Sequence, residues 1–295
     1  MPTPAEHRQP THRGLFISLV KDAALFPPAA RPIPEALAEH ARHDASPYSD
    51  VVGPFLVGVP MVRDLLAALD EGAPAPRAVG LVARPGTEVP EIDAALATLT
   101  ADPRVRVVSV DAGWSPQWRN LDLGELPIHL EVGRDRPGDV LDDIASAAPF
   151  VDVRAKFRTG ATPTWAWPGT EELAGFFLGA TERQLPFVLT GGLHHVVRGQ
   201  HPVHGAKGDA PEEQHGLLNV LVAVHGATGG SDAGTVRELL DIRDAGALAD
   251  IVAAWSVPDI AAVRAALAGY GCCDVTDPIG ELTDLGLLAA EGSGG

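Results

Sequence analysis

The chain is poor in cysteine and lysine, and each shortage narrows the class of protein to which it can belong. Only two of its 295 residues are cysteines, the adjacent Cys272 and Cys273. Neighbouring cysteines rarely form a structural disulfide, which argues against a disulfide-stabilised secreted fold. The first residues also lack the basic start and apolar run of a secretory signal. We therefore expect a cytoplasmic protein.

Positive charge is scarce as well. Twenty-two basic residues face 39 acidic ones, which leaves a net charge of −17 that repels phosphate backbones and anionic lipid head groups. Apolar runs such as 144–151 and 217–224 are far shorter than the roughly 20 residues that cross a bilayer. We expect no nucleic-acid and no membrane partner. The partner that we expect is a small anionic substrate, for which the residues are described below, and a homo-oligomer is compatible with this composition.

Lysine is used only three times, at positions 21, 156 and 207, whereas arginine supplies nearly all other positive charge. The abundance of Ala, Gly, Pro and Arg indicates GC-rich coding, under which a generic surface cation drifts to arginine. Each remaining lysine is therefore a candidate for amine chemistry. The chain has no GxGxxG, Walker, HExxH or paired CxxC motif, so the sequence predicts no cofactor.

Short β-branched and apolar runs alternate with Ala- and Leu-rich stretches of helical period. The predicted strands are 14–20, 54–59, 77–83, 105–111, 127–132, 150–157, 186–190 and 270–275. The predicted helices are 34–43, 62–69, 92–99, 138–147, 171–183, 216–224, 235–252 and 260–268. The connection 112–126 has no clear helical pattern.

Eight strands alternating with helices predict a (β/α)8 barrel of the TIM type, because eight is the number at which such a sheet closes. We assign residues 14–290 to one barrel domain, with flexible tails at 1–13 and 291–295. The long interval after the seventh strand predicts an extended insertion of helix and loop before the eighth. An open, doubly wound sheet is the alternative.

The predicted sixth strand has one ionic face. Its charged residues alternate with apolar ones and therefore share one side of the strand; they are Asp152, Arg154, Lys156 and Arg158. In a barrel the apolar side packs against the helices, which leaves the ionic side facing the interior. Unpaired charge is costly there, so the interior must hold partners.

The neighbouring strands supply those partners. His129 and Glu131 alternate with apolar residues on the fifth strand, and Asp111 ends the fourth. We expect Asp111, Glu131, Lys156 and Arg158 to converge near the carboxyl end of the barrel, where such folds place their active sites. Lys156 would be a nucleophile, a general base or an anion clamp, with Asp111 and Glu131 as its partners. A structural ion network that only fills the barrel is the other interpretation.

A second cluster follows the seventh strand. The turn Thr190-Gly191-Gly192 lets backbone N–H groups approach an anion, and His194 and His195 come directly after it. Both histidines are predicted catalytic residues, because imidazole titrates near neutral pH. The predicted substrate-binding residues are Arg158, Thr159, Thr190, Gly191, Gly192 and Lys21.

Three further interpretations concern the same end of the barrel. The polar segment 198–214 is typical of a long loop that closes over a site as a lid. A metal site built from His194, His195, Glu131 and Asp111 is an alternative to lysine chemistry. A thiol of Cys272 or Cys273 beside His194 is a candidate nucleophile, although small buried cysteines are more common.

The sixth and seventh strands resemble those of class I aldolases of the deoxyribose-phosphate aldolase type. The segments carrying the resemblance are 153–160, VRAKFRTG, and 187–192, FVLTGG. The resemblance implies a barrel with a Schiff-base lysine on strand six, at Lys156, and a second lysine on strand seven. That second lysine is absent here: the matching positions are Val188 and Leu189, and the two histidines follow instead.

These residues favour a barrel enzyme, a lyase or isomerase, acting on a small anionic carbonyl, carboxylate or phosphorylated compound. In this hypothesis Lys156 is the nucleophile or base, Arg158 binds the anion and a histidine carries the proton. A metal-dependent hydrolase or lyase is the second hypothesis. A noncatalytic binding or scaffold protein on a degenerate barrel is the third.

Overall fold

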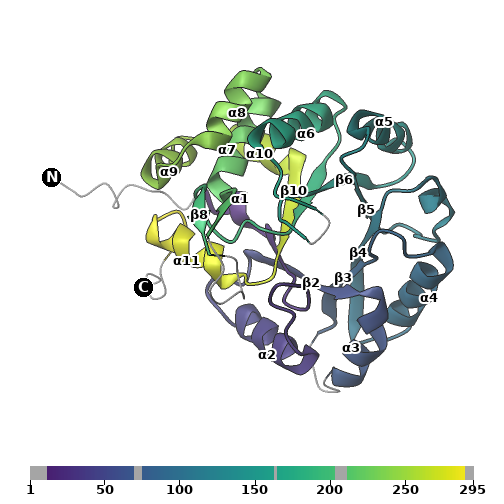
Figure 1. The fold of residues 1–295 in the computed structure, drawn as a ribbon. Coiled ribbons are helices and arrows are strands. Elements are labelled where there is room, and N and C mark those ends of the chain that lie inside the picture. The colour runs from purple at the N-terminus through teal and green to yellow at the C-terminus, as the bar shows by residue number, and fades with distance from the viewer. Residues whose placement is uncertain (1–11, 70–74, 163–164, 203–210, 290–295) are drawn as a thin grey trace.

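A computed structural model shows a closed ring of eight parallel strands surrounded by helices (Figure 1). It describes residues 12–69, 75–162, 165–202 and 211–289. The ring closes because β1 (Val20–Asp22) pairs with β10 (Leu267–Cys272) on one side and with β2 (Val52–Gly58) on the other. The predicted (β/α)8 barrel is therefore confirmed, and the open sheet is wrong.

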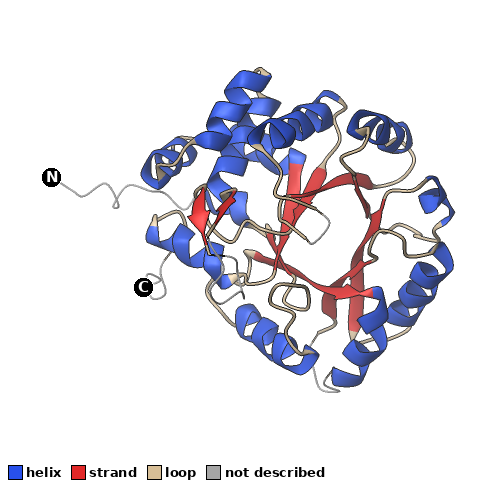
Figure 2. Cartoon of the chain, viewed as in Figure 1, coloured by secondary structure: helices blue, strands red, loops and turns tan. Residues whose placement is uncertain are grey.

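The other strands follow one another around the ring in chain order, and Figure 2 shows them as the closed inner layer. They are β3 (Arg77–Val82), β4 (Val105–Gly113), β5 (Ile128–Glu131), β6 (Val153–Arg158) and β7 (Phe187–Thr190). Each matches a predicted strand to within a few residues. Between β7 and β10 lies the predicted insertion, which contains a small hairpin and four helices.

The helices form the outer layer. They are α2 (Ile33–Asp44), α3 (Val62–Ala68), α4 (Val89–Thr100), α5 (Pro137–Ala147), α6 (Thr170–Glu182), α7 (Leu217–Thr228), α8 (Ala233–Asp241), α9 (Ala245–Ala253), α10 (Val257–Ala266) and α11 (Thr276–Asp284). Short 3-10 helices, η3 (Val59–Met61) and η4 (Pro116–Asn120), add to them, the second within the connection that has no clear helical pattern. Proline in the first turn begins α2, α4, α5 and α10, where its missing N–H costs nothing.

The first predicted strand, 14–20, is largely wrong. Its beginning forms the helical turn α1 (Arg13–Phe16), and β1 starts only at Val20. A short apolar run fits a strand and a buried helical turn equally well, because both bury its side chains. Arg13, which the sequence places in a flexible tail, lies in α1 and binds Asp50 at 2.6 Å. Residues 1–11 of that tail, and the predicted tail 291–295, lie outside the described residues, while His12 is buried.

Two helix predictions also need correction. The predicted helix 235–252 is two helices, because Asp244 accepts a hydrogen bond from the Ala247 backbone N–H and starts α9 anew. Helix α11, after the last strand, was not predicted at all. Its first turn contains Pro278, and its buried side chains are few: Pro278, Ile279 and Leu282.

The alternation predicted for the sixth strand is visible in its packing. Phe157 stacks on Phe176 of α6 with ring centroids 4.6 Å apart, and Phe187 of β7 packs beside Phe176 and Phe177. Since neighbouring residues of a strand point to opposite sides, Lys156 and Arg158 face away from α6 and into the ring.

The insertion builds a second helical layer over one side of the barrel. Helix α7 is buried on nearly every side, and α6, α8, α9 and α10 pack around it, as the crowding of these helices in Figure 1 shows. Among the described residues no single helix has the length and apolar character of a membrane span, although the bent pair α9 and α10 passes that test jointly.

The loops after β6 and β7 touch at Gly160. A Cβ placed on Gly160 would lie 2.7 Å from the backbone nitrogen of Gly192 and 2.8 Å from the carbonyl carbon of Gly191. Such contacts cannot be relieved by a side-chain movement, so the close approach of the two loops depends on glycine at this position.

We expect Gly160→Ala to lower the free energy of unfolding by about 1–3 kcal/mol, because the added methyl group must push two backbone segments apart. Gly175→Ala is the matched control: it lies on the exposed face of α6 with open space around its Cβ, and should stabilise the protein by about 0.5–1 kcal/mol. Denaturant unfolding measures both. Equal effects of the two substitutions would contradict the close approach.

Candidate functional site

The barrel interior contains an ion-paired lysine. Nζ of Lys156 lies 3.0 Å from Oδ2 of Asp111 and 3.8 Å from Oε2 of Glu131, and all three side chains are buried or nearly so. Register explains the contact, because Glu131 of β5 stands directly opposite Lys156 of β6. Asp111 reaches the same amine from β4. The structure therefore brings together the two carboxylates and the lysine that the sequence grouped.

Arg158 extends this group toward solvent. Its Nε and Nη2 lie 3.1 and 3.4 Å from the two carboxylate oxygens of Glu131, a two-point contact. The exposed fraction rises from 5% for the Lys156 side chain to 24% for Arg158. Glu131 thus bridges a buried ammonium and a partly open guanidinium. Arg154 on the same face pairs instead with Asp152, a half-exposed carboxylate.

A second lysine enters from the opposite wall. Strands β1 and β5 lie four positions apart in the ring of eight, yet Nζ of Lys21 reaches to 3.4 Å from Nδ1 of His129. The same Nδ1 lies 2.6 Å from Oδ1 of Asp111. Two lysines and one histidine therefore surround a single aspartate, and all four side chains are buried.

Burial controls how these groups titrate. It lowers the pKa of Lys21 to about 8, with help from the positive charge of Lys156 and against the attraction of Asp111. It also lowers the pKa of His129 to about 4, so this imidazole is neutral at pH 7. Burial alone would raise the pKa of Asp111, but the nearby cations, Lys156 first, hold it well below its ordinary value.

The neutral ring of His129 has one free position. Its Nδ1–H donates to Asp111, which leaves Nε2 as a lone-pair acceptor. Among the described residues Nε2 is buried and has no hydrogen-bond partner. Native proteins rarely leave such an atom unpaired, so Nε2 is suited to a hydrogen bond from a ligand.

Three predicted substrate-binding residues lie in one row. Lys21 of β1 pairs in register with Gly271 of β10, Gly271 with Thr190 of β7, and Thr190 with Arg158 of β6. Register partners in a parallel sheet point to the same side. Gly271 contributes no side chain, so the row presents an amine, a hydroxyl and a guanidinium to the interior. Sequence reasoning did not single out Gly271.

The predicted Gly-Gly turn is sharply folded. Gly191 and Gly192 have φ of 72° and 71°, and Leu193 follows at 57°, a left-handed conformation that costs energy for a side chain with a Cβ. Gly191 lies against Arg158, since a Cβ on this glycine would be 3.5 Å from Nη1. The hydroxyl of Thr159 donates to the Gly191 carbonyl, so this predicted substrate-binding group holds the turn instead.

His194 and His195 are held by α11. Nδ1 of His194 lies 3.0 Å from Asp277, and Nδ1 of His195 lies 2.7 Å from Glu281. The two carboxylates are four residues apart and share one face of the helix. Their pairing explains why α11 follows the barrel, and no motif search would have found it, because each carboxylate follows its histidine by more than 80 residues.

Two alternatives drawn from the sequence lose support. No group of three His, Cys, Asp or Glu side chains in the described part of the chain is placed to hold a metal ion, which counts against the proposed metal site. The predicted lid 198–214 is not one long loop. Its ends pair as an antiparallel hairpin of β8 (Gly199–His201) and β9 (Glu212–Gln214), and 203–210 lie outside the described residues.

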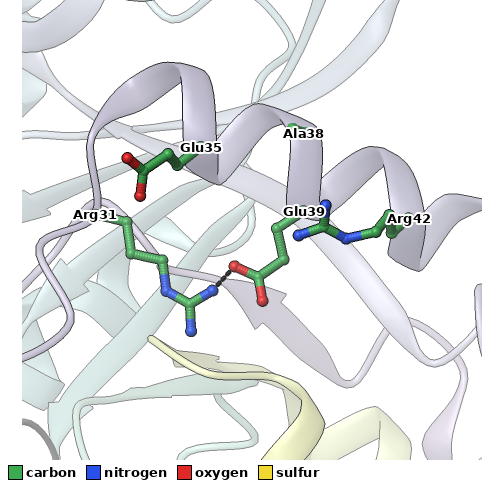
Figure 3. A pocket seen from close by; sticks show the side chains of 5 residues that line it. All are labelled: Arg31, Glu35, Ala38, Glu39 and Arg42. Atoms are coloured by element: carbon green, nitrogen blue, oxygen red, sulfur yellow. Dashed lines mark ion pairs between the residues drawn. The ribbon is translucent and has the colours of Figure 1, made fainter.

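A hollow of about 380 Å³ lies beside α2, and Figure 3 shows the side chains that line it. Its charged lining is two arginines and two glutamates, Arg31, Arg42, Glu35 and Glu39. Arg31 pairs with Glu39 and also binds Asp274 at 2.7 Å. Since these opposite charges largely satisfy one another, we place the candidate site in the barrel interior.

The buried amine of Lys21 should make the free energy of unfolding depend on pH. Its pKa is about 8 in the folded chain against 10.5 in the unfolded one, so the unfolded state binds more protons between these values and stability rises with pH. From pH 7 to pH 10.5 the free energy of unfolding should rise by about 3 kcal/mol relative to Lys21→Met. Denaturant unfolding of both proteins across this range measures the difference, and a flat difference would contradict the buried amine.

Comparison with protein-family models and with curated proteins found no match to this chain, so no family is shown and the function rests on the geometry of the site.

Proposed function

We propose that the protein is a barrel enzyme, a lyase or isomerase, which forms a Schiff base with a small anionic carbonyl compound. The observation that carries this proposal is the approach of two buried lysine amines to one aspartate: Lys156 lies 3.0 Å from Asp111, and Lys21 reaches His129, which binds the same carboxylate. Burying two amines is costly, and a core filled only for stability would use apolar side chains there. Burial and a neighbouring cation are the two ways in which a lysine amine becomes a nucleophile, and Lys21 has both.

The two lysines would have different roles. A Schiff base forms only from a neutral amine, which attacks the carbonyl carbon and loses water to give an iminium. Lys21 has a lowered pKa and lies beside the neutral His129, so a useful fraction of it is uncharged at pH 7 to 8. Lys156 lies between the carboxylates of Asp111 and Glu131, at 3.0 and 3.8 Å. We assign the nucleophile to Lys21 and the fixed positive charge to Lys156.

This assignment gives the site a second lysine, which the aldolase resemblance implies but the seventh strand lacks. The seventh strand has Val188 and Leu189 where that family has a second lysine, and Lys21 of β1 supplies the second amine. The order of roles is exchanged, because the lysine of strand six is the one held by carboxylates. Lys156 as the nucleophile remains the variant of the proposal that the sequence favours.

The anionic end of the substrate would bind at the more open end of the site. Arg158 is partly exposed, offers Nη1 beside the Gly191 turn, and lies in the same row as Thr190 and Lys21. A carboxylate or phosphate held there would direct the carbonyl carbon toward the buried amines.

Proton transfer would fall to His129 and Asp111. The iminium draws electrons from the adjacent carbon, so a C–C or C–H bond there can break if a group receives or returns a proton. Nε2 of His129 is the acceptor available among the described residues, and Asp111 orients the ring through Nδ1. His194 and His195, the predicted proton carriers, have α11 carboxylates as partners instead.

Reduction with borohydride in the presence of pyruvate or glyceraldehyde 3-phosphate should attach one of these probes to a single lysine. We expect the adduct on Lys21, since reduction fixes the iminium as a stable secondary amine. Peptide mass spectrometry locates it. Lys21→Met should lose the adduct, and Lys156→Met should retain it at a reduced rate, because the positive charge that lowers the pKa of Lys21 is gone.

Lys207, the third lysine of the sequence, is the internal control for nonspecific reaction. An adduct on Lys156 alone would keep the Schiff base and exchange the two roles. Equal labelling of all three lysines, or none above the level of a denatured sample, would contradict the proposed function and leave a noncatalytic barrel.

A further inference from the structure

A second cluster of reactive groups lies at the carboxyl end of β10. The ring of His194 sits between the two cysteines of the chain: Sγ of Cys273 lies 3.4 Å from Nε2, and Sγ of Cys272 lies 3.7 Å from Nδ1. Oδ2 of Asp277 lies 3.0 Å from the same Nδ1. Thiol, imidazole and carboxylate therefore follow one another in the order Cys273, His194, Asp277.

The two thiols are not equivalent. The Cys272 thiol donates to the backbone carbonyl of Asp274 at 3.0 Å, and burial raises its pKa. Cys273 faces the ring nitrogen opposite the one that binds Asp277. This is the arrangement in which a histidine can take the thiol proton while a carboxylate fixes the ring. Cys272 has the surroundings of a structural cysteine and Cys273 those of a nucleophile.

The fold holds the ring in place at some cost. Leu193, directly before His194, is buried and adopts a left-handed conformation, with φ of 57°. On its other side His195 is fixed by Glu281, whose second oxygen accepts the Val196 backbone N–H at 2.7 Å. Strain of this kind persists only where surrounding contacts determine the conformation, and here they determine the position of His194.

The ring is also strongly basic in this position. Burial lowers the pKa of His194, but hydrogen bonds with Asp277 and the two thiols outweigh it and raise the pKa to about 12. The groups that face Cys273 in this cluster are therefore a positively charged imidazole and, through it, the Asp277 carboxylate. An adjacent positive charge favours the thiolate, which is the reactive form of cysteine.

We propose that Cys273 is a site of covalent modification by peroxides, with His194 as its acid–base partner and Asp277 as the positioning residue of that ring. Cys273 is 5% exposed, which suits a reagent as small as hydrogen peroxide, whereas Cys272 is 1% exposed. The site shares no residue with the proposed Schiff-base chemistry, so either proposal can fail alone.

The reaction balances with peroxide as the only co-reactant. In the starting ion pair the thiol proton is already on the His194 ring, and the thiolate sulfur of Cys273 attacks one oxygen of hydrogen peroxide. An S–O bond forms while the O–O bond breaks, and the leaving hydroxide takes the proton back from the imidazolium. The products are the sulfenic acid of Cys273 and water, so sulfur is oxidised and the peroxide is reduced.

The test uses the full chain with one cysteine at a time. Cys272→Ser leaves only Cys273, and Cys273→Ser leaves only Cys272. Under hydrogen peroxide with dimedone, which captures sulfenic acids, we expect the adduct in Cys272→Ser and little in Cys273→Ser. In the natural protein, fragmentation mass spectrometry should place the adduct on residue 273, which keeps the test valid even if a variant folds poorly.

His194→Asn and Asp277→Asn, each in the Cys272→Ser background, test the partners. Between pH 8 and pH 6 the alkylation rate of Cys273 by iodoacetamide should fall less than about tenfold with His194 present, and about 100-fold in His194→Asn, as for an ordinary thiol. The pH dependence of alkylation in Asp277→Asn should lie between that of the protein with His194 and Asp277 intact and that of His194→Asn. Restoring aspartate at position 277 should restore the original pH profile. An adduct on Cys272, or a pH profile unchanged in His194→Asn, would overturn the proposal.

Discussion

The central constraint on this barrel is the burial of two lysine amines around one aspartate. Asp111 has Lys156 within ion-pair distance, and His129 binds its other oxygen while Lys21 approaches the same imidazole. One carboxylate cannot neutralise two ammonium groups. Glu131 is a second carboxylate partner of Lys156 and also pairs with Arg158, whereas burial lowers the pKa of Lys21. The two amines therefore lie in unlike surroundings.

The outer packing of the barrel strands stabilises a barrel whose interior is charged. The outward side chains of β6 and β7 form a tight aromatic layer with α6, so the strands are fixed from outside while their inner faces carry charge. Gly271 adds no side chain to the row that joins Lys21 to Thr190 and Arg158, and Leu56 packs close to it, since a Cβ on this glycine would lie 3.3 Å from Cδ1 of Leu56. Rigid walls therefore carry a charged interior without loosening the core.

Pattern reasoning predicted much of this architecture because it depends on local periodicity. The alternation along β6 correctly turned Lys156 and Arg158 inward, and the pairing of β5 with β6 follows from the order of strands. The approach of Lys21 to His129 was beyond such reasoning, since it depends on ring closure and on the reach of a side chain across the interior. The sequence did not predict helix α11 because its apolar stripe is short. The role of its Asp277 and Glu281 becomes visible only once the structure places them beside His194 and His195.

The dependence of the β7 turn on α11 also sets an order of assembly. Synthesis runs from the amino end, so His195 leaves the ribosome 86 residues before Glu281, the carboxylate that fixes it. Until Glu281 is present, the left-handed conformation at Leu193 lacks the hydrogen bond between His195 and Glu281 that helps to hold it. The eight-stranded ring can begin to close as β10 emerges, but the two imidazole rings reach their final positions only after α11 has formed.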